Sequence, residues 1–267
     1  MTGLMAGKRG LIMGLANDKS LAWGIAQKLS EAGAELAFSY QGEALAKRVK
    51  PLAEQLGSDF IFDCDVSDMA ALDTAFAGLA ERWPTLDFLV HAIGFSDKNE
   101  LRGKYVDTSL DNFLMTMNIS AYSFVAVAKR ARAMMPEGGS LLTLTYYGAE
   151  KVVPHYNVMG VAKAALEASV RYLAADLGPQ GVRVNAISAG PMRTLAGAVI
   201  GSARYVYRVS REASPLRRNI ELTDVGGAAL YYLSDLAAGV TGTVHYVDAG
   251  YHAMGMPPQG SGGAGSE

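Results

Sequence analysis

The sequence has one cysteine, no strong charge excess and no long apolar run, and each absence argues against a class of protein. Cys64 alone cannot form an internal disulfide, which fits a reducing, cytoplasmic setting. A net charge of -2 argues against a nucleic-acid-binding protein, which would normally carry a basic excess. No run reaches the roughly 18 apolar residues of a membrane span, and the first residues lack a signal-peptide pattern. We therefore expect a cytoplasmic protein without nucleic acid or membrane partners.

The composition and the order of its segments predict an α/β protein. Half of the 267 residues are hydrophobic and 19% are charged, as in an ordinary globular domain. Apolar runs rich in β-branched residues predict strands at 9–14, 35–40, 59–62, 86–91, 140–144, 182–187 and 243–247. Helical patterns fall between them at 21–32, 43–56, 68–82, 109–134, 156–177 and 223–234. This alternation predicts a doubly wound Rossmann-type fold, a seven-stranded parallel sheet with helices on both faces.

We expect a single domain over residues 1–256, because no linker or internal repeat divides the chain. The stretch 257–267 is of low complexity, rich in glycine and serine, and is predicted to be a disordered tail.

The turn after the first strand is a candidate phosphate-binding loop, although it departs from the common G-x-G-x-x-G pattern. Gly14 permits a sharp turn, Ser20 can cap the next helix, and Gly24 allows that helix to pack closely on the strand. Free N–H groups at the helix start would face a pyrophosphate. Glycine at such a turn can equally be only steric.

Other candidate cofactor residues follow the second, third, fourth and sixth strands, at the edge where a dinucleotide binds in such folds. They lie in 64–66, 91–94 and 189–191, and Asp65 could accept a hydrogen bond from an adenine amino group. At the end of the second strand Gln41 is neutral, and no Lys or Arg stands at 39–41 to neutralise a 2′-phosphate. The sequence therefore favours NADH over NADPH.

The helix predicted at 156–177 carries a candidate catalytic pair. Tyr156 and Lys163 are seven residues apart, which places them on one helix face about 10 Å apart along the axis. Lys163 could bind a nicotinamide ribose and Tyr156 a reacting carbonyl, with the ammonium making the phenol a better donor. An interfacial tyrosine and a solvated lysine remain the alternative. Gly160, Ala164 and Ala168 form a smooth stripe that suits close packing on a second subunit or on the sheet.

These residues together carry a resemblance to a known family. The motifs are Gly14-x5-Ser20-Leu21-Ala22-x-Gly24, His91–Ser96, Tyr146-x9-Tyr156-x6-Lys163 and the run 183–196. From about residue 8 to 253 the chain resembles the short-chain dehydrogenase/reductase superfamily and, within it, the bacterial enoyl-acyl-carrier-protein reductases. Most of the superfamily places Tyr four residues before Lys, with Ser about a dozen residues earlier. Here position 159 is Met, and Tyr146 stands in the region of the serine.

The resemblance implies a reaction and its residues. Hydride would pass from NADH to the β-carbon of a trans-2-enoyl thioester on acyl carrier protein, in the last step of fatty-acid elongation. Tyr156 would hold the enolate oxygen, Lys163 would bind the nicotinamide ribose, and Tyr146 would line the pocket. Substrate contacts are implied for Ser96, Tyr146 and Tyr156. The implied NAD-binding residues are Gly14, Ser20, Leu21, Gln41, Asp65, Val66, Ile93, Gly94, Lys163, Met192, Thr194, Leu195 and Ala196.

The resemblance also implies a homotetramer and a substrate-binding lid at about 194–212. Many relatives carry an aromatic residue where Ala203 stands, which leaves the shape of the acyl pocket open. Residues 193–218 contain six arginines and one acid, Glu212. We hypothesise that part of this stretch steers the acidic carrier protein, while solvated charges or ion pairs at a subunit contact are the alternative.

Two other functions stay open from the sequence. A carbonyl-reducing member of the superfamily, of the 3-ketoacyl reductase type, is disfavoured by Met159. A non-catalytic NAD-binding sensor is disfavoured because Tyr156 and Lys163 are both present. The four histidines show no metal-ligand spacing, so we expect no metal, with His91 structural and His155 exposed in a loop.

Overall fold

The computed structural model describes residues 3–192 and 203–256. The expected tail at 257–267 and part of the expected lid, including Thr194, Leu195 and Ala196, lie outside these residues. Seven strands form one sheet in the order β3-β2-β1-β4-β5-β6-β7, and every neighbouring pair is parallel. The strands are β1 (Arg9–Met13), β2 (Glu35–Tyr40), β3 (Ile61–Asp63), β4 (Phe88–His91), β5 (Gly139–Thr145), β6 (Val182–Ala189) and β7 (Val244–Val247). The predicted fold class is confirmed.

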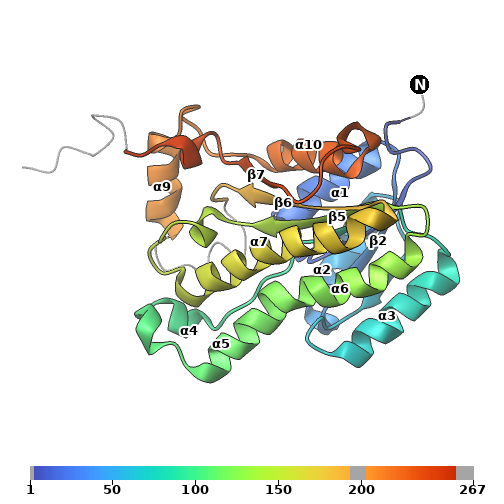
Figure 1. Ribbon diagram of the computed structural model, residues 1–267, viewed down its shortest axis with the longest axis horizontal. Coiled ribbons are helices and arrows are strands. Elements are labelled where there is room, and N and C mark those ends of the chain that lie inside the picture. The colour runs from blue at the N-terminus through green and yellow to red at the C-terminus, as the bar shows by residue number, and fades with distance from the viewer. Residues whose placement is uncertain (1–2, 193–202, 257–267) are drawn as a thin grey trace, which may run out of the picture.

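Helices cover both faces of the sheet (Figure 1). Packed on one face are α1 (Leu21–Glu31), α2 (Gly42–Gln55) and α10 (Leu222–Leu233); on the other are α3 (Met69–Arg82), α6 (Ser123–Ala131) and α7 (Asn157–Leu177). Neighbouring residues of a strand point to opposite faces, so Leu11 joins the core under α3, α6 and α7, while Ile12 joins the core under α1 and α10. Both side chains are fully buried, as expected for a strand inside a doubly wound sheet.

The helix expected at 109–134 is not continuous. The chain forms α5 (Leu110–Met117), a π-helical turn at Asn118–Tyr122, α6, and a 3₁₀ turn at Arg132–Met134. A π turn adds one residue to the helical repeat and changes the direction in which the following side chains point. No glycine or proline lies within 110–131. The sequence therefore gives no local sign of the break.

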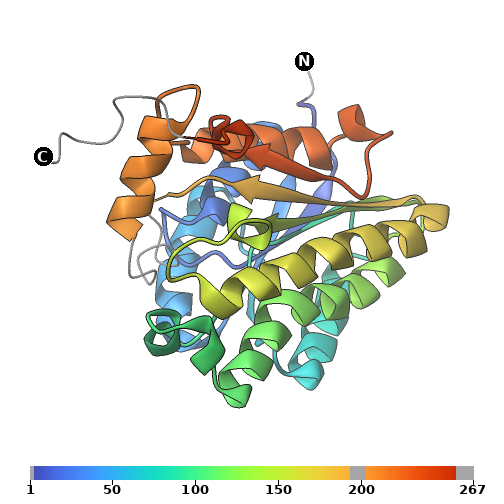
Figure 2. The same ribbon diagram turned by 60° about the vertical axis from the view of Figure 1, so that its left-hand side comes forward.

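Several short elements were not predicted. The one-turn helix α4 (Lys98–Leu101) follows β4, and α9 (Ala203–Ala213) lies in the second half of the expected lid. Both lie at the end of the molecule that comes forward in Figure 2. Further 3₁₀ turns span Tyr105–Asp107, Tyr147–Ala149, Gly178–Gln180, Asp235–Ala237 and Tyr251–Ala253. Within the described ranges, no helix has both the length and the apolarity to cross a membrane.

The glycine pair between α1 and α10 corrects one expectation. A Cβ added to Gly24 would lie 2.6 Å from the backbone oxygen of Leu222, and one added to Gly226 would lie 2.5 Å from the backbone oxygen of Gly24. Gly24 therefore permits close packing of two helices rather than of a helix on a strand, because the backbones approach where both residues lack a side chain.

Candidate active site

The predicted site residues gather at one edge of the sheet. All seven strands are parallel, so their carboxyl ends meet at that edge. Chain order reverses between β1 and β4, the place where open α/β sheets form a ligand crevice. Gly14 follows β1, Gln41 follows β2, and Ile93 and Gly94 follow β4. Tyr146 follows β5 and Met192 follows β6, so segments far apart in the sequence meet at one edge of the sheet.

Gly14 makes the turn that opens this crevice. Its φ of +96° lies in the left-handed region, which side chains disfavour. A Cβ at this position would lie 2.1 Å from the backbone oxygen of Ala92. The glycine is therefore needed for both conformation and space.

Ser20 stands at the N-cap of α1, as expected, but its side chain does not cap the helix. Its hydroxyl accepts hydrogen bonds from the backbone N–H groups of Ala16 at 3.1 Å and Asn17 at 3.0 Å. The serine therefore stabilises the 14–20 loop. Because this oxygen accepts no hydrogen bond from the first N–H groups of α1, those groups are available to an anion at this helix end.

Gln41 and Asp65 contact each other across the ends of β2 and β3. The Gln41 amide donates to the Asp65 carboxylate at 2.8 Å, and the Ser67 hydroxyl donates to it at 2.7 Å. Partial burial alone would raise the pKa of Asp65, but the hydrogen bonds from Ser67 and Gln41 hold it below its ordinary value. The carboxylate is therefore ionised at neutral pH and can accept further hydrogen bonds. The adjacent Val66 is buried.

The segment after β4 is held from behind by α5 and the π turn. The Ser120 hydroxyl accepts from the backbone N–H of Phe95 at 2.9 Å and contacts its carbonyl oxygen at 3.0 Å. A Cβ on Gly94 would lie 3.5 Å from the Lys163 ammonium. The backbone at 93–95 is thus fixed beside Lys163.

Ser96 lies in a buried polar cluster with two residues of α5. Its hydroxyl donates to Asn112 Oδ1 at 3.3 Å and accepts from Thr116 at 2.9 Å. Only 6% of Ser96 is exposed. These two contacts are structural, and the expected contact with substrate stays a prediction.

Two tyrosines form the centre of the site. The rings of Tyr146 and Tyr156 meet edge to face with centroids 5.1 Å apart, and Tyr156 is buried. A Cβ on Gly148 would lie 2.4 Å from the Tyr156 ring, so this glycine makes room for it. Tyr156 is the N-cap of α7 rather than its first residue, because α7 begins at Asn157.

Burial raises the pKa of Tyr156 well above its ordinary value, and Tyr146 and Glu167 add to the increase. Burial also raises the pKa of Tyr146, with smaller contributions from Tyr251 and Asp248. Both phenols are therefore protonated at neutral pH and can act as hydrogen-bond donors. The expected electrostatic support from Lys163 is not among the causes acting on Tyr156.

Lys163 is buried inside the site, not solvated. Its ammonium donates to the backbone carbonyl of Leu144 at 2.9 Å and approaches that of Ile93 at 3.5 Å, and 8% of the residue is exposed. Burial lowers the pKa of Lys163 to about 8, while the charge of Glu167 opposes that decrease. An ammonium has three protons, so a third remains for a ligand after these two carbonyls.

Comparisons with known proteins agree with this arrangement. Residues 14–252 match the family described as Enoyl-(Acyl carrier protein) reductase. The chain is 63% identical over 255 residues to enoyl-[acyl-carrier-protein] reductase [NADH] 1 of Rhizobium meliloti (strain 1021), covering 96% of this chain and 94% of that relative. The chain belongs to the enoyl-acyl-carrier-protein reductase family.

Two solved structures are similar to this enoyl reductase in both sequence and fold. The crystal structure of FabI from Candidatus Liberibacter asiaticus is 56% identical, with a TM-score of 0.95 and coverage of 97% of this chain and 100% of that one. The reductase of Anaplasma phagocytophilum, solved in complex with NAD, is 61% identical, with a TM-score of 0.93 and coverage of 97% and 98%.

The residues of this enoyl reductase include donors and an acceptor that fit a dinucleotide. The start of α1 offers N–H groups that the Ser20 hydroxyl leaves free, Asp65 offers an ionised acceptor, and Lys163 offers a proton beyond its two carbonyl contacts. By their chemistry, these groups suit a phosphate, a polar base edge and a hydroxyl respectively.

Polar residues on the inner side of the 110–131 helical stretch were not predicted as site residues. They are buried, lie at helical spacing and support the segment after β4. The signal available in the sequence was their spacing of three or four residues, which places their hydroxyl and amide groups on one face of the helix. If that face is buried, these groups need polar partners there. The set is Asn112, Thr116, Ser120 and Ser123.

Glu167 was also missed, although it lies one turn beyond Lys163 on the same helix. It is buried and accepts a hydrogen bond from the Thr145 hydroxyl at 2.7 Å. Burial raises its pKa, and the hydrogen bond from Thr145 opposes that increase. An acid four residues after a lysine on one predicted helix was the readable signal, because residues at that spacing share a helix face.

The small residues predicted to form a stripe on α7 do not all lie in the same environment. A Cβ on Gly160 would lie 2.8 Å from the backbone oxygen of Gly148, so this glycine packs within the chain. Ala164 is exposed, and so is Val161 beside it.

His91 and His155 lie as expected. His91 is fully buried with its ring nitrogens 2.9 Å from the Thr143 and Ser123 hydroxyls, and burial together with the charge of Lys163 lowers its pKa to about 3. It is a neutral structural residue. His155 is exposed in the loop before α7.

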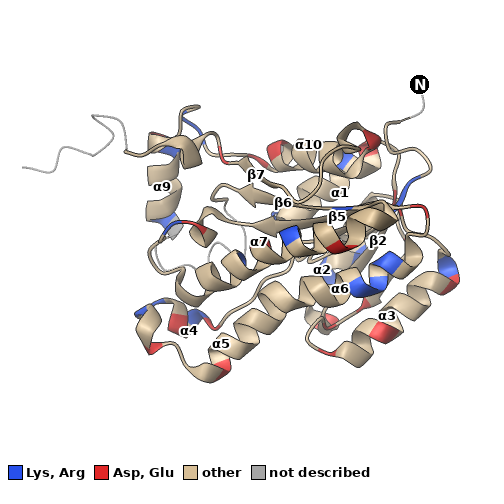
Figure 3. Ribbon diagram, in the orientation of Figure 1, with Lys and Arg blue, Asp and Glu red and all other residues tan. Residues whose placement is uncertain are grey.

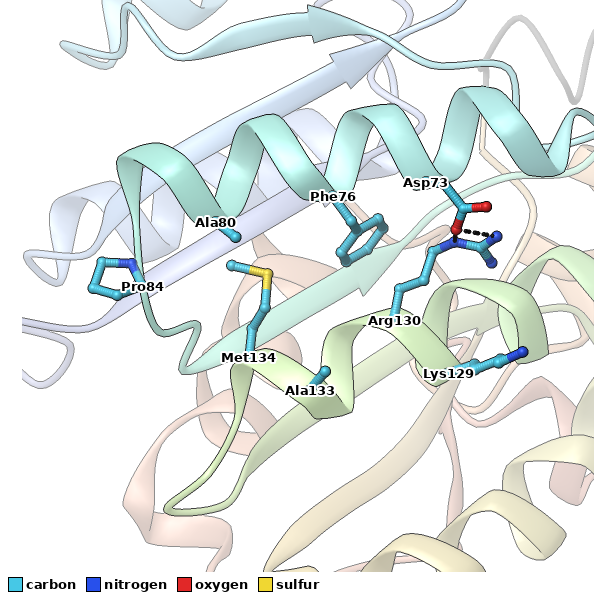
Figure 4. A pocket seen from close by; sticks show the side chains of 8 residues that line it. All are labelled: Asp73, Phe76, Ala80, Pro84, Lys129, Arg130, Ala133 and Met134. Atoms are coloured by element: carbon cyan, nitrogen blue, oxygen red, sulfur yellow. Dashed lines mark hydrogen bonds and ion pairs between the residues drawn. The ribbon is translucent and has the colours of Figure 1, made fainter.

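A hollow of about 500 Å³ lies away from the site, between α3 and the end of α6 (Figure 4). Apolar side chains such as Phe76 and Met134 line it, and two of its three charged residues, Arg130 and Asp73, pair at 2.7 Å. It shares no residue with the tyrosine and lysine site.

Proposed function

We propose that this chain catalyses the NADH-dependent reduction of the trans-2 double bond of enoyl thioesters, the closing step of fatty-acid elongation. The single observation that carries the proposal is the site of Tyr146, Tyr156 and buried Lys163 at the carboxyl edge of the sheet, in a chain of this family. The reaction places it among oxidoreductases that act on CH–CH bonds.

Tyr156 stabilises the negative charge that develops on the thioester oxygen. Bound NADH would supply the hydride that the β-carbon of the substrate accepts, and a proton added at the α-carbon would complete the reduction. As the thioester oxygen gains charge, the protonated Tyr156 phenol donates a hydrogen bond to it, and the raised pKa of the phenol keeps its proton in place. A hydrogen bond to a charged group contributes about 1.5–3 kcal/mol, which corresponds to about 10–150-fold in rate. Tyr146 packs against this ring and lines the pocket.

Lys163 would hold the ribose of the cofactor. Two of its protons are directed to Leu144 and Ile93, and the third is available to a ribose hydroxyl. Gly14, Ser20 and Leu21 would hold the pyrophosphate end, and Gln41, Asp65 and Val66 would hold the adenosine end. Ile93, Gly94 and Met192 complete the described part of the cofactor site, with Thr194, Leu195 and Ala196 expected beyond it. Ser96 is expected to contact substrate.

A substitution at Tyr156 tests these roles. Tyr156→Phe should lower kcat for an enoyl thioester by about 10–150-fold and leave NADH binding, measured by cofactor fluorescence, within twofold. Tyr231→Phe is the matched control, because Tyr231 is 40% exposed on α10 and belongs to no part of the site. A parent protein that binds NADH without turning over any thioester would favour the sensor function. Unchanged kcat in Tyr156→Phe would remove this tyrosine from the mechanism.

We infer that the acidic acyl carrier protein docks near α9, where basic residues lie among the segments coloured blue in Figure 3. Arg204 and Arg208 are exposed, whereas Arg217 donates to the Glu212 carbonyl and Arg218 pairs with Asp224. Arg204 and Arg208 are therefore the better candidates for steering.

Charge reversal tests this docking. Arg204→Glu with Arg208→Glu should raise KM for the carrier-protein substrate at least tenfold more than KM for a short CoA thioester, since only the protein partner spans α9. Arg132→Glu, an exposed arginine at the end of α6, is the control. Equal changes with both substrates would contradict the docking proposal.

The assembly and location follow from the family resemblance as proposals. The exposed apolar residues Val161 and Tyr172 on the outer face of α7 support a homotetramer. The presence of a single cysteine supports a cytoplasmic location. Light scattering of the purified protein should give four times the mass of 28.2 kDa. A monomer at micromolar concentration would exclude the tetramer.

A further inference from the structure

The backbone on both sides of Tyr156 is held in an unusual conformation. His155 has a φ of +61° and Asn157 a φ of +40°, so two residues in the left-handed region flank the tyrosine. Asn and His adopt this region more readily than most residues, but it still carries strain that the surroundings must offset. The position of the Tyr156 ring is therefore imposed by contacts rather than by local preference.

The Asn157 side chain makes those contacts. Its amide nitrogen lies 2.8 Å from the carbonyl oxygen of Gly103, 3.1 Å from that of Leu101 and 3.4 Å from that of Glu100. These carbonyls belong to the end of α4 and the residues just after it, where helix carbonyls lack partners within the helix. One amide thus joins the start of α7 to the end of α4.

The α4 turn is itself a fixed reference point. The backbone N–H of Asp97 donates to Asn112 Oδ1 at 3.0 Å, and the Glu100 carboxylate accepts from the backbone and hydroxyl of Ser109 at 2.9 and 2.7 Å. α4 directly follows the 93–96 segment that borders the cofactor crevice. Asn157 therefore links the tyrosine to the segment after β4.

Lys163 does not depend on this link. It lies almost two turns further along α7, and its ammonium is held by the carbonyls of Leu144 and Ile93. Loss of the Asn157 amide should therefore disturb Tyr156 and leave the lysine in place.

We propose that Asn157 is a positioning residue that fixes the Tyr156 hydroxyl for the reaction, through its left-handed backbone and its amide bonds to the end of α4. The inference rests on the proposed function, in which Tyr156 stabilises the developing enolate. A misplacement of about 1 Å in a reacting group can lower a rate by up to about 100-fold, so a single such contact is enough to matter.

Two substitutions separate the amide from the backbone. Asn157→Gly keeps the freedom to adopt a positive φ and removes the amide, whereas Asn157→Ala removes both. Each should lower kcat about tenfold or more, with KM for NADH within twofold of the parent. Asn99→Ala is the matched control, because Asn99 lies on α4 with an exposed side chain. Wild-type kcat in Asn157→Gly would show that only the backbone matters and would overturn the role of the amide.

A double variant identifies the residue through which Asn157 acts. In a Tyr156→Phe background, adding Asn157→Ala should lower kcat less than twofold further, because the hydroxyl being positioned is already absent. A further tenfold loss would overturn the proposal and indicate a general defect, which a fall in Tm and in NADH binding would accompany. If Tyr156→Phe alone keeps full activity, the proposed role of Tyr156 fails first. If Tyr156→Phe loses activity and Asn157→Ala does not, only the positioning inference fails.

Discussion

The buried lysine makes a quantitative prediction about stability. Replacing Lys163 by Met removes a charge that burial disfavours, and keeps most of the side-chain volume. The folded-state pKa of Lys163 is about 8, against its ordinary value of 10.5. Below pH 8 the lysine is protonated in both the folded and the unfolded chain, so the unfavourable burial of its charge acts in full. Between pH 8 and 10.5 the unfolded chain holds a proton that the folded chain has lost.

The stability of the parent should therefore rise with pH relative to that of the Met variant. The gap between 10.5 and about 8 corresponds to about 3 kcal/mol in total, of which about 2 kcal/mol falls between pH 7 and 9.5. The bonds that Met cannot make to Leu144 and Ile93 add a difference that does not vary with pH. Only the pH-dependent part of the difference in the free energy of unfolding reports the ionisation of Lys163.

Urea unfolding followed by circular dichroism, at one protein concentration and without cofactor, measures this difference. The free energy of unfolding of Lys163→Met minus that of the parent should fall by about 2 kcal/mol from pH 7 to 9.5. Lys151→Met, at an exposed position, is the matched control. A difference for Lys163→Met that does not change with pH would refute the conclusion that burial lowers the pKa of this lysine.

Three further predictions concern neighbouring residues. Gly14→Ala should lower the free energy of unfolding by at least about 1–3 kcal/mol in urea melts, because φ is positive there and a Cβ would lie 2.1 Å from a backbone oxygen; unchanged stability would contradict the described turn. Ser120→Ala should raise the Kd for NADH in fluorescence titrations, because it frees the Phe95 backbone, and a Kd equal to that of the parent would exclude this support. Glu167→Gln removes the charge that raises the pKa of Lys163, so the alkaline limb of the kcat/KM profile should move to lower pH; a shift to higher pH would reverse the assigned sign.

The sheet could be predicted from the sequence because its signals are local. Each strand is a short apolar run between turn residues, and its parallel order follows from the helices in between. The break at Asn118–Tyr122 could not be predicted, since no residue there disfavours an α-helix strongly. It is stabilised instead by a tertiary contact, the hydrogen bonds between Ser120 and Phe95.

The site could be predicted where a motif carries it. Tyr146, Tyr156 and Lys163 stand at a characteristic spacing, but their burial and hydrogen bonds became visible only in three dimensions. Asn157 was missed because its amide partners lie more than 50 residues earlier in the chain, on a helix of one turn. The expected helix cap at Ser20 was wrong for a different reason, since its hydroxyl accepts from Ala16 and Asn17 in its own loop and not from α1.

Oxidation of NADH, followed at 340 nm with a trans-2-enoyl thioester and with a 3-ketoacyl thioester, tests the central claim most directly. The account predicts turnover of the enoyl substrate, with the saturated thioester as product, at a kcat/KM at least tenfold above that with NADPH. Turnover of the ketoacyl substrate alone would contradict it and would identify a carbonyl reductase.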